Sequence, residues 1–524
     1  MAFPRFNLLV ALILLISTES GAQRIKAAES RQSGMMAFPE LLERNYFRNE
    51  RKLRIIERYN AEGKDQRAYQ HLKAYVRRFA TRNFQYDGPV LADFARLSVK
   101  YGPEGEALLI ARLLVRHQPK GIDSLQIRRL YDSLERSGPS RFLTPREYLL
   151  LVASLNEADA REPGLAVNLG EAVNSPAEDY APTFGNTDNI LLFTSKRNRH
   201  QTDLTAPPDE DLFISLRRDG QWQKAIELRT VNTIYNEGSA CLSPDGKTLY
   251  FSRCDAAGSF GNCDLYMATL SKDSVWQNIV NLGRNVNSGG WESHPALTRT
   301  GDTLFFASNR IGGFGLSDIY FSIRNRDGKW GKATNAGPMI NTHNSEVSPF
   351  VHHRHAELYF SSNGQPVNFG DFDIYRTPIP RNGRYSEPEN CGPLINSGGH
   401  EYYFTMDARS GEILFARSAS LLDARTDIYT RPLPMEGQPD ADALLAGKIM
   451  DDNGIPLRGV IRAEDLTGGM EIAPRYLGND GYFRFLVKSG AEYRLTAVTP
   501  DGKIFRKEVP AGNADEWIDW VIKP

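Results

Sequence analysis

The chain has 524 residues, of which 24% are charged and 41% hydrophobic, and its formal net charge is −1. This balance is typical of a folded globular protein, and the near-zero net charge argues against a nucleic-acid binder, which would carry an excess of Lys and Arg. Because a single hydrophobic core does not grow to this length, we expect two to four domains.

The first residues have the pattern of a secretory signal peptide. Arg5 is followed by an apolar run over residues 8–16 and by small residues at positions 20–22. A basic start, a short apolar core and small residues at a cleavage point define such a peptide, and the run is too short to span a bilayer comfortably. We predict a signal peptide over residues 1–22 and a periplasmic mature chain without a transmembrane segment, with outer-membrane association as an alternative.

Residues 23–162 have the period of amphipathic helices. Leu53, Ile56 and Tyr59 follow one another at steps of three residues, as on one helix face. Further helices are predicted over residues 66–79, 90–99, 105–115, 124–134 and 145–155, the last starting at Thr144 and Pro145. Helix pairs of this length resemble tetratricopeptide-type repeats, so we expect a helical array with a groove for a peptide or a partner helix.

Charge is unevenly distributed along the chain. Residues 24–161 contain 26 Lys and Arg against 17 Asp and Glu, a net charge of +9. This excess favours a helical module that docks on an anionic partner, and solvated helix faces are the alternative explanation.

A phrase of about 54 residues recurs through the middle of the chain. An aspartate followed by a hydrophobic and an aromatic residue recurs at Asp211, Asp264, Asp318, Asp373 and Asp427. An acid recurs at Glu178, Glu237, Glu292, Glu346 and Glu401, and an asparagine at Asn174, Asn232, Asn287, Asn341 and Asn396. A fixed period indicates one supersecondary unit per repeat. Each unit contains four strand candidates separated by turns, which is the blade of a β-propeller.

The ends of the repeat region predict how the propeller closes. Residues 167–174 match the fourth-strand pattern of residues 280–287, yet they precede the first complete unit, and the last unit lacks a fourth strand. We therefore expect the N-terminal strand to pair beside residues 427–430 and complete the last blade, which removes the open sheet edges. Residues 165–431 are then a five-bladed β-propeller.

The composition changes again after the propeller. Residues 432–442 have the composition of a linker, and residues 443–524 contain alternating strands and a tight Asn453-Gly454 turn. These features predict a small β-sandwich over residues 443–524. The expected fold class is thus multidomain, α plus all-β: a helical-repeat array, a five-bladed β-propeller and a C-terminal β-sandwich.

The four cysteines permit two interpretations. Cys254 and Cys263 flank a Gly-rich turn between two strands of one blade, so an oxidising compartment would allow a disulfide. Alternatively, all four cysteines are small, partly buried apolar residues. Cys-x-x-Cys spacing is absent from the sequence, which argues against a zinc or thioredoxin-type site.

The recurring acids are better explained as structural residues than as catalytic ones. A propeller glycosidase needs a pair of carboxyl groups, but a catalytic residue is needed once and a packing residue in every blade. We therefore predict structural roles for Glu237, Glu292, Glu346, Glu401, Asp211, Asp264, Asp318, Asp373 and Asp427. His352, His353 and His355 could ligate a metal, but no neighbouring acid or cysteine completes a set, so we favour an exposed polar turn. We predict no catalytic residue, metal or cofactor.

The repeat units resemble the WD-like propeller repeats of bacterial envelope proteins related to TolB, through the acid-x-x-Pro start, the Leu-Tyr-Phe-Ser-x-Arg strand and the Asp-Ile-Tyr strand. Residues 447–459 and 480–483 resemble the carboxypeptidase regulatory-like domain. The order of the three modules is similar to that of periplasmic Bacteroidetes proteins, among them a component of the type IX secretion and gliding machinery. Those proteins often end in an OmpA-like peptidoglycan-binding domain, whereas this chain ends at Pro524 after the sandwich.

The resemblance implies a non-enzymatic periplasmic scaffold that binds other proteins of the cell envelope. A propeller that binds carbohydrate or peptidoglycan fragments is the alternative, and a propeller glycosidase is a third possibility. The expected partners are other envelope proteins, with peptidoglycan or another glycan as the alternative ligand, and no nucleic acid.

Overall fold

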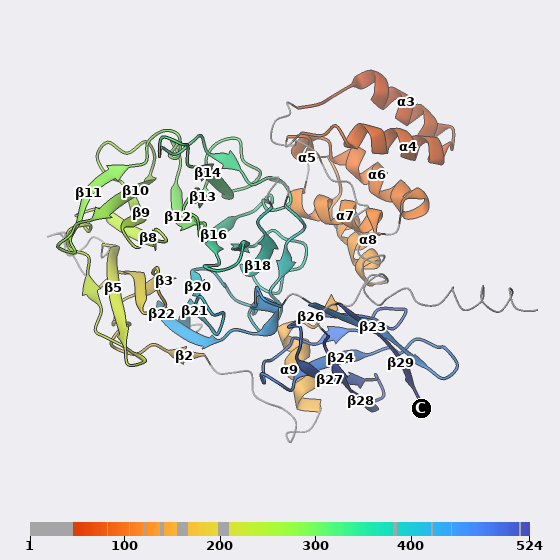
Figure 1. Cartoon of the computed structure of the whole chain (residues 1–524). Coiled ribbons are helices and arrows are strands. Elements are labelled where there is room, and N and C mark those ends of the chain that lie inside the picture. Colours follow the sequence, from red (N-terminus) through yellow and green to blue (C-terminus); the bar gives the residue numbers. More distant parts are fainter. Residues whose placement is uncertain are drawn as a thin grey trace, which may run out of the picture.

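The computed structural model describes residues 46–80, 82–103, 105–118, 121–136, 141–154, 166–197, 209–380, 385–420, 423–441, 443–512 and 515–523. The predicted signal peptide lies outside these residues. Figure 1 shows a ring of sheets, a stack of helices beside it and a smaller β-structure at the C-terminal end.

The helical part follows the predicted pattern closely. Its helices are α3 (Glu50–Ala61), α4 (Asp65–Val76), α5 (Asn83–Tyr86), α6 (Gly88–Tyr101), α7 (Glu106–His117) and α8 (Ser124–Arg136). Their apolar faces share one core, in which Leu72, Phe94 and Leu113 are buried. Asn49 caps α3, since its side chain accepts a hydrogen bond from the backbone N–H of Lys52.

The segment after α8 does not continue the helix stack. Strand β1 (Arg141–Phe142) pairs antiparallel with β25 (Arg475–Tyr476) of the C-terminal β-structure. Helix α9 (Pro145–Ser154) begins at the predicted residue. The backbone N–H of Thr144 donates to the carboxylate of Glu147 at 2.8 Å, and the backbone N–H of Glu147 donates to the hydroxyl of Thr144 at 3.3 Å, so the two residues form a capping box. In Figure 1, α9 lies beside β24 and β27. Part of the segment expected as a single helical array over residues 23–162 therefore packs on the C-terminal strands.

The ring consists of five antiparallel sheets. They are formed by β3 (Asp179–Phe184), β4 (Ile190–Ser195), β5 (Asp211–Arg218), β6 (Gln221–Trp222) and β7 (Ile226–Glu227); β8 (Asn236–Leu242), β9 (Thr248–Cys254), β10 (Cys263–Leu270) and β11 (Trp276–Asn281); β12 (Glu292–Leu297), β13 (Thr303–Ser308), β14 (Asp318–Ile323) and β15 (Thr334–Asn335); β16 (Glu346–Val351), β17 (Glu357–Ser362), β18 (Asp373–Pro378) and β19 (Glu389–Asn390); and β20 (Phe404–Met406), β21 (Glu412–Ser420) and β22 (Asp423–Pro432) with β2 (Val167–Asn168). The first strands contact one another in the order β3, β8, β12, β16, β20 and back to β3. This closed arrangement is a β-propeller.

The predicted pairing of the N-terminal strand is confirmed. Val167 lies opposite Thr430 and Asn168 opposite Tyr429 in the β2–β22 ladder. The backbone N–H of Leu169 also donates to the carbonyl of Ile428 at 3.1 Å. The two ends of the ring are thus joined by backbone hydrogen bonds, which cover the edge that β22 would otherwise expose.

The C-terminal strands form two sheets around a common core. The sheets have the orders β1-β25-β24-β27-β28 and β26-β23-β29, with β23 (Ala443–Asp451), β24 (Val460–Asp465), β26 (Tyr482–Val487), β27 (Glu492–Val498), β28 (Ile504–Pro510) and β29 (Glu516–Ile522). Leu445, Ile461, Phe485 and Leu495 are buried between them.

The predicted linker is packed between the propeller and the C-terminal strands. Met435, Glu436 and Gln438 are buried. Tyr359 of β17 donates from its hydroxyl to the carbonyl of Gly437 at 2.8 Å, and the side chain of Arg376 donates to the carbonyl of Gln438 at 2.6 Å. The linker is therefore a fixed connection between the two parts.

Candidate functional site

The recurring acids are used to hold the ring together. Each accepts two hydrogen bonds, from the backbone N–H and from the hydroxyl of a Ser or Thr four residues earlier, with N···O distances of 2.6–3.0 Å. The pairs are Ser175 with Asp179, Thr233 with Glu237, Ser288 with Glu292, Thr342 with Glu346 and Ser397 with Glu401. In the first repeat the acid is therefore Asp179, and the expectation that Glu178 fills this position is wrong. Asp179 is fully buried, whereas Glu178 forms an ion pair with Lys196 near the surface.

The residue before each Ser or Thr is the recurring asparagine, which bonds to the preceding sheet. The side chain of Asn287 accepts from the N–H of Leu265 at 2.8 Å and donates to its carbonyl at 3.0 Å. The same pair of bonds joins Asn232 to Leu212, Asn341 to Ile319, Asn396 to Ile374 and Asn174 to Ile428. Each Asn-Ser/Thr pair thus staples the third strand of one sheet to the first strand of the next, and Asn174-Ser175 closes the ring in the same way.

Three of the recurring aspartates, Asp264, Asp318 and Asp373, hold the turns that precede the third strands of their sheets. Asp318 accepts hydrogen bonds from the N–H groups of Phe314 and Gly315 and from the side chain of Asn335. Asp264 and Asp373 have the equivalent three donors. Burial raises the pKa of Asp318 to about 6 and that of Asp373 to about 7. These contacts are what a turn-holding role requires.

The sheet of Glu346 departs from an ion-pair pattern that three other sheets share. Arg197, Arg253 and Arg310 each pair with the acid of their own sheet. At the corresponding place beside Glu346 the chain has Gly364, where an added Cβ would lie 1.9 Å from the hydroxyl oxygen of Thr342. Burial, followed by the charge of Asp318, raises the pKa of Glu346 to about 8. Glu346 is therefore mostly protonated at neutral pH.

The structure also places the cysteines and histidines that were candidates for a disulfide or a metal site. A disulfide joins Cys254 of β9 to Cys263 of β10, which lie directly opposite each other in the ladder, while Cys241 and Cys391 are buried free thiols. His352 is fully buried and accepts backbone N–H bonds within its turn, so this residue differs from the exposed turn we expected. Within the described residues, no group of three or more potential metal-binding side chains is found.

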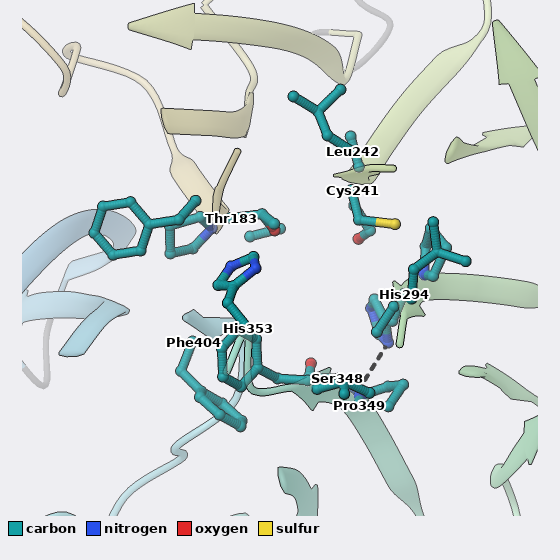
Figure 2. Close-up of a pocket in the computed structure, with 18 of the residues that line it drawn as sticks. Thr183, Cys241, Leu242, His294, Ser348, Pro349, His353 and Phe404 are labelled. Atoms are coloured by element: carbon teal, nitrogen blue, oxygen red, sulfur yellow. Dashed lines mark hydrogen bonds between the residues drawn. The ribbon is translucent and has the colours of Figure 1, made fainter. Parts of the chain in front are cut away.

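A cavity of about 180 Å³ lies in the centre of the ring (Figure 2). The first strands of all five sheets line it, with residues such as Thr183, Ser239, His294, Ser348 and Tyr403. Five of the lining residues, one each in β3, β8, β12, β16 and just before β20, have a left-handed backbone with φ of 49–57°. In β3, β8, β12 and β16 this residue lies at a β-bulge. The bulge re-aims the strand at the cavity.

The cavity lining combines apolar side chains with polar ones such as Asn186, Ser243 and Thr298, and it is poor in charge. Among its described lining residues there is no Asp, Glu or Lys, and Arg299 has an exposed side chain. Burial lowers the pKa of His294 to about 3, and His294 accepts a hydrogen bond from the N–H of Ser348 at 3.2 Å. Because Nδ1 accepts this bond, the ring proton of the neutral imidazole is on Nε2. Burial also lowers the pKa of His353, which reaches into the cavity (Figure 2).

This cavity was not among the features predicted from the sequence. Its lining residues lie two to seven positions after the recurring acids, and prolines at positions 182, 295 and 349 mark three of the strands. The acid-x-x-Pro pattern contained this signal, because proline is tolerated on strands that form a sheet edge. Which side chains meet across the ring axis depends on the closure of all five sheets.

The chain matches no protein-family model and no curated protein. Similar solved structures include TolB from Acinetobacter baumannii, at 12% identity over 60% of this chain and 70% of that chain with a TM-score of 0.33. They also include a putative TolB from Agrobacterium tumefaciens (13% identity, 67% and 92% of the two chains, TM-score 0.32) and an α-L-arabinofuranosidase from Lactobacillus brevis (10%, 49% and 90%, 0.35). These matches include both TolB proteins and a glycosidase, so they assign no function to this chain. Within its described residues, no helix is both long and apolar enough to cross a membrane.

Proposed function

We propose that this protein is a non-enzymatic scaffold that binds other proteins in a periplasmic cell-envelope assembly, of the type IX secretion or gliding kind that its sequence resembles. In this proposal the helices are a tetratricopeptide-like array, each sheet of the ring is one blade of a five-bladed propeller, and residues 443–524 are a carboxypeptidase regulatory-like sandwich.

The observation that carries the proposal is the use of the recurring carboxyl groups. Hydrolysis of a glycoside needs an acid and a second carboxylate that flank the bond to be cleaved. Glu237 and Glu292 are fully buried and hydrogen-bonded to their own turns and arginines. The described lining of the central cavity offers no carboxyl group in their place. This distribution supports a binding role over a glycosidase.

The rigid connection of the parts also favours a scaffold. Gln85 of α5 donates to the carbonyl of Gly313 in the propeller at 2.9 Å, and Phe314 is buried in the core of the helices. At the other end, Arg484 of β26 pairs with Glu389 of β19 at 3.4 Å. A partner bound to one part is therefore held at a defined position relative to the others.

We assign the partner contact to the basic helical part. Arg51 and Arg54 of α3 are both exposed. If they face an anionic partner, capture of that partner from the native envelope should weaken as salt rises, because exposed charges are screened beyond about 10 Å at 0.1 M salt.

The test compares two double variants of equal charge change. Arg51→Glu with Arg54→Glu should abolish capture of the partner that the wild type retains at low salt. Arg326→Glu with Lys503→Glu, at exposed positions on the propeller and the C-terminal strands, should leave capture intact. Equal capture by both variants would place the contact elsewhere. If the wild type captured no specific partner from the envelope, the scaffold proposal would be contradicted.

A further inference from the structure

The helix stack carries an exposed aromatic pair beside exposed cations, at the end where α3 begins and α5 lies. The pair is Tyr46 and Tyr86, and the cations are Arg78 and Arg82; together these four residues are the tyrosine surface. We propose that the tyrosine surface binds an acidic peptide segment of the partner, which packs an apolar side chain on the two rings. The inference rests on the proposed scaffold function and names the chemistry of the partner.

The two tyrosines form one exposed aromatic patch. Tyr46 is 40% exposed and Tyr86 52%, and their rings meet edge to face with centroids 6.2 Å apart. Tyr, Trp and Arg are enriched among the residues that contribute most to the free energy of protein–protein binding. An exposed tyrosine pair beside arginines therefore has the composition of an interface centre.

The buried side chain of Asn83 holds this patch in place. It accepts a hydrogen bond from the backbone N–H of Phe47 at 3.2 Å and donates to the carbonyl of Phe47 at 2.7 Å. The guanidinium carbon of Arg78 lies over the Phe47 ring, 4.3 Å from its centroid. The residues before α3 are thus fixed against α5, and a partner that binds here does not have to order them.

The charge around the patch favours an acidic partner. Residues 46–87 contain 11 Lys and Arg against five Asp and Glu, a net charge of +6. Arg78 and Arg82 are exposed, and within the described residues neither forms an ion pair. Residues 23–45 have a net charge of +1, so this segment of the chain does not supply the acidic complement. Opposite charge on a partner would guide it to this surface.

The tyrosine surface is less suited to a lipid bilayer. Helices that bind membrane surfaces bury Trp, Phe or Leu side chains at the edge of the acyl chains. Within the described part of residues 46–87, the exposed large hydrophobic residues are the two tyrosines. The hydroxyl of Tyr46 also donates to Asp87 at 3.5 Å, which keeps this ring beside a polar group. We therefore assign the surface to a peptide and not to a membrane.

The test measures the fluorescence anisotropy of labelled peptides as the mature chain is added. The main probe has four glutamates on each side of a central Leu-Phe-Phe-Leu segment. One comparison peptide has lysines in place of the glutamates, and the other consists of glutamates only. We expect saturable binding of the main probe, at least tenfold tighter than binding of either comparison peptide. This binding should weaken as salt rises, because salt screens exposed charges.

Two double variants with the same change in charge locate the contact. Tyr86→Ala with Arg82→Glu should weaken binding of the main probe at least tenfold. The matched control is Ile323→Ala with Arg326→Glu on the propeller, where Ile323 is 54% exposed and Arg326 is exposed. It should bind the probe as the wild type does.

Absence of saturable binding to the wild type would overturn the proposal, as would equal binding by the two double variants. Equal affinity for the glutamate-only peptide would overturn it in favour of a general anion site. Binding to phosphatidylglycerol vesicles, or self-association of the chain, that only the Tyr86 variant loses would overturn it in favour of a membrane or a second copy. Capture of an envelope partner that depends on Arg51 and Arg54 could still be observed in each case, so failure here is distinct from failure of the scaffold proposal.

Discussion

Arg116 and Glu387 join the helices to the propeller through a hydrogen bond of 3.0 Å between Nη2 and Oε1, although 271 residues separate them. Arg112 approaches the other carboxylate oxygen of Glu387 at 3.3 Å, and Arg116 also donates to the side chain of Gln365 at 2.9 Å. Burial opposes the ionisation of Glu387, but the two arginines hold its pKa below the usual value. The contact is thus a charged bridge between two parts of the chain, with Arg116 buried and Glu387 partly exposed.

Removal of this bridge should loosen the helical part. Arg116→Met leaves Glu387, whose side chain is 24% exposed, with Arg112 as its remaining cation. The expected loss of unfolding free energy is therefore below the about 3–5 kcal/mol of a fully buried charge without a partner. We expect a lower melting temperature and faster proteolysis between the helices and the propeller. Arg54→Met, at an exposed site on α3, is the matched control and should change stability by less than about 0.5 kcal/mol. Equal proteolysis of both variants would show that Arg116 does not hold the interface.

The free energy of unfolding should depend on pH through Glu346. The pKa of Glu346 is raised to about 8 in the folded state, so the folded chain binds this proton when the unfolded chain has lost it. Stability therefore falls as pH rises from about 4.5 to about 8. Glu346→Gln removes this contribution, and its unfolding free energy should fall less between pH 5 and pH 8 than that of the wild type. Chemical denaturation at both pH values measures the difference, and an unchanged pH slope would contradict it.

The staple that closes the ring should be as strong as those within it. Asn174→Ala removes two hydrogen bonds to Ile428, and Asn287→Ala removes two to Leu265. We expect each variant to lose about 1–3 kcal/mol of unfolding free energy. Replacement of residues 166–174 by a Gly-Ser segment should go further and cause aggregation, because it exposes the edge of β22. A soluble, cooperatively melting chain after this replacement would show that β2 is not needed for closure.

The disulfide can be tested by counting thiols. The chain has four cysteines, and Cys254 and Cys263 are joined. Unfolded protein kept away from reductant should therefore react with a thiol reagent at two positions, and reduced protein at four. Four reactive thiols before reduction would mean that the bond does not form in the native compartment.

The ring could be predicted from the sequence because the asparagine and the acid that join adjacent sheets recur in every repeat. The position of β2 beside β22 follows from one fourth-strand pattern at the start and one missing at the end. The repeat pattern alone does not distinguish Glu178 from Asp179, because the two carboxyl residues are adjacent in the sequence. Only burial separates them: Asp179 lies inside the ring with Ser175, whereas Glu178 pairs with Lys196.

The contacts between the parts could not be predicted in this way. The guanidinium carbon of Arg475 lies over the ring of Phe142, 3.3 Å from the ring centre. Neither residue belongs to a repeat or a periodic pattern. Such contacts join segments far apart in the sequence, and amphipathic period reports only that a face is buried. The central cavity is hidden for the same reason, since five strands contribute to it.

The central claim is that the recurring acids hold the ring and catalyse nothing, and Glu292→Gln tests it most directly. Glu292 accepts hydrogen bonds from Ser288 and Ser308 and pairs with Arg310. One sample each of wild type and variant is measured for unfolding free energy and for hydrolysis of a panel of aryl glycosides. We predict no hydrolysis above the buffer rate by either protein and a loss of about 1–3 kcal/mol in the variant. Hydrolysis by the wild type that disappears in a variant of unchanged stability would contradict the claim.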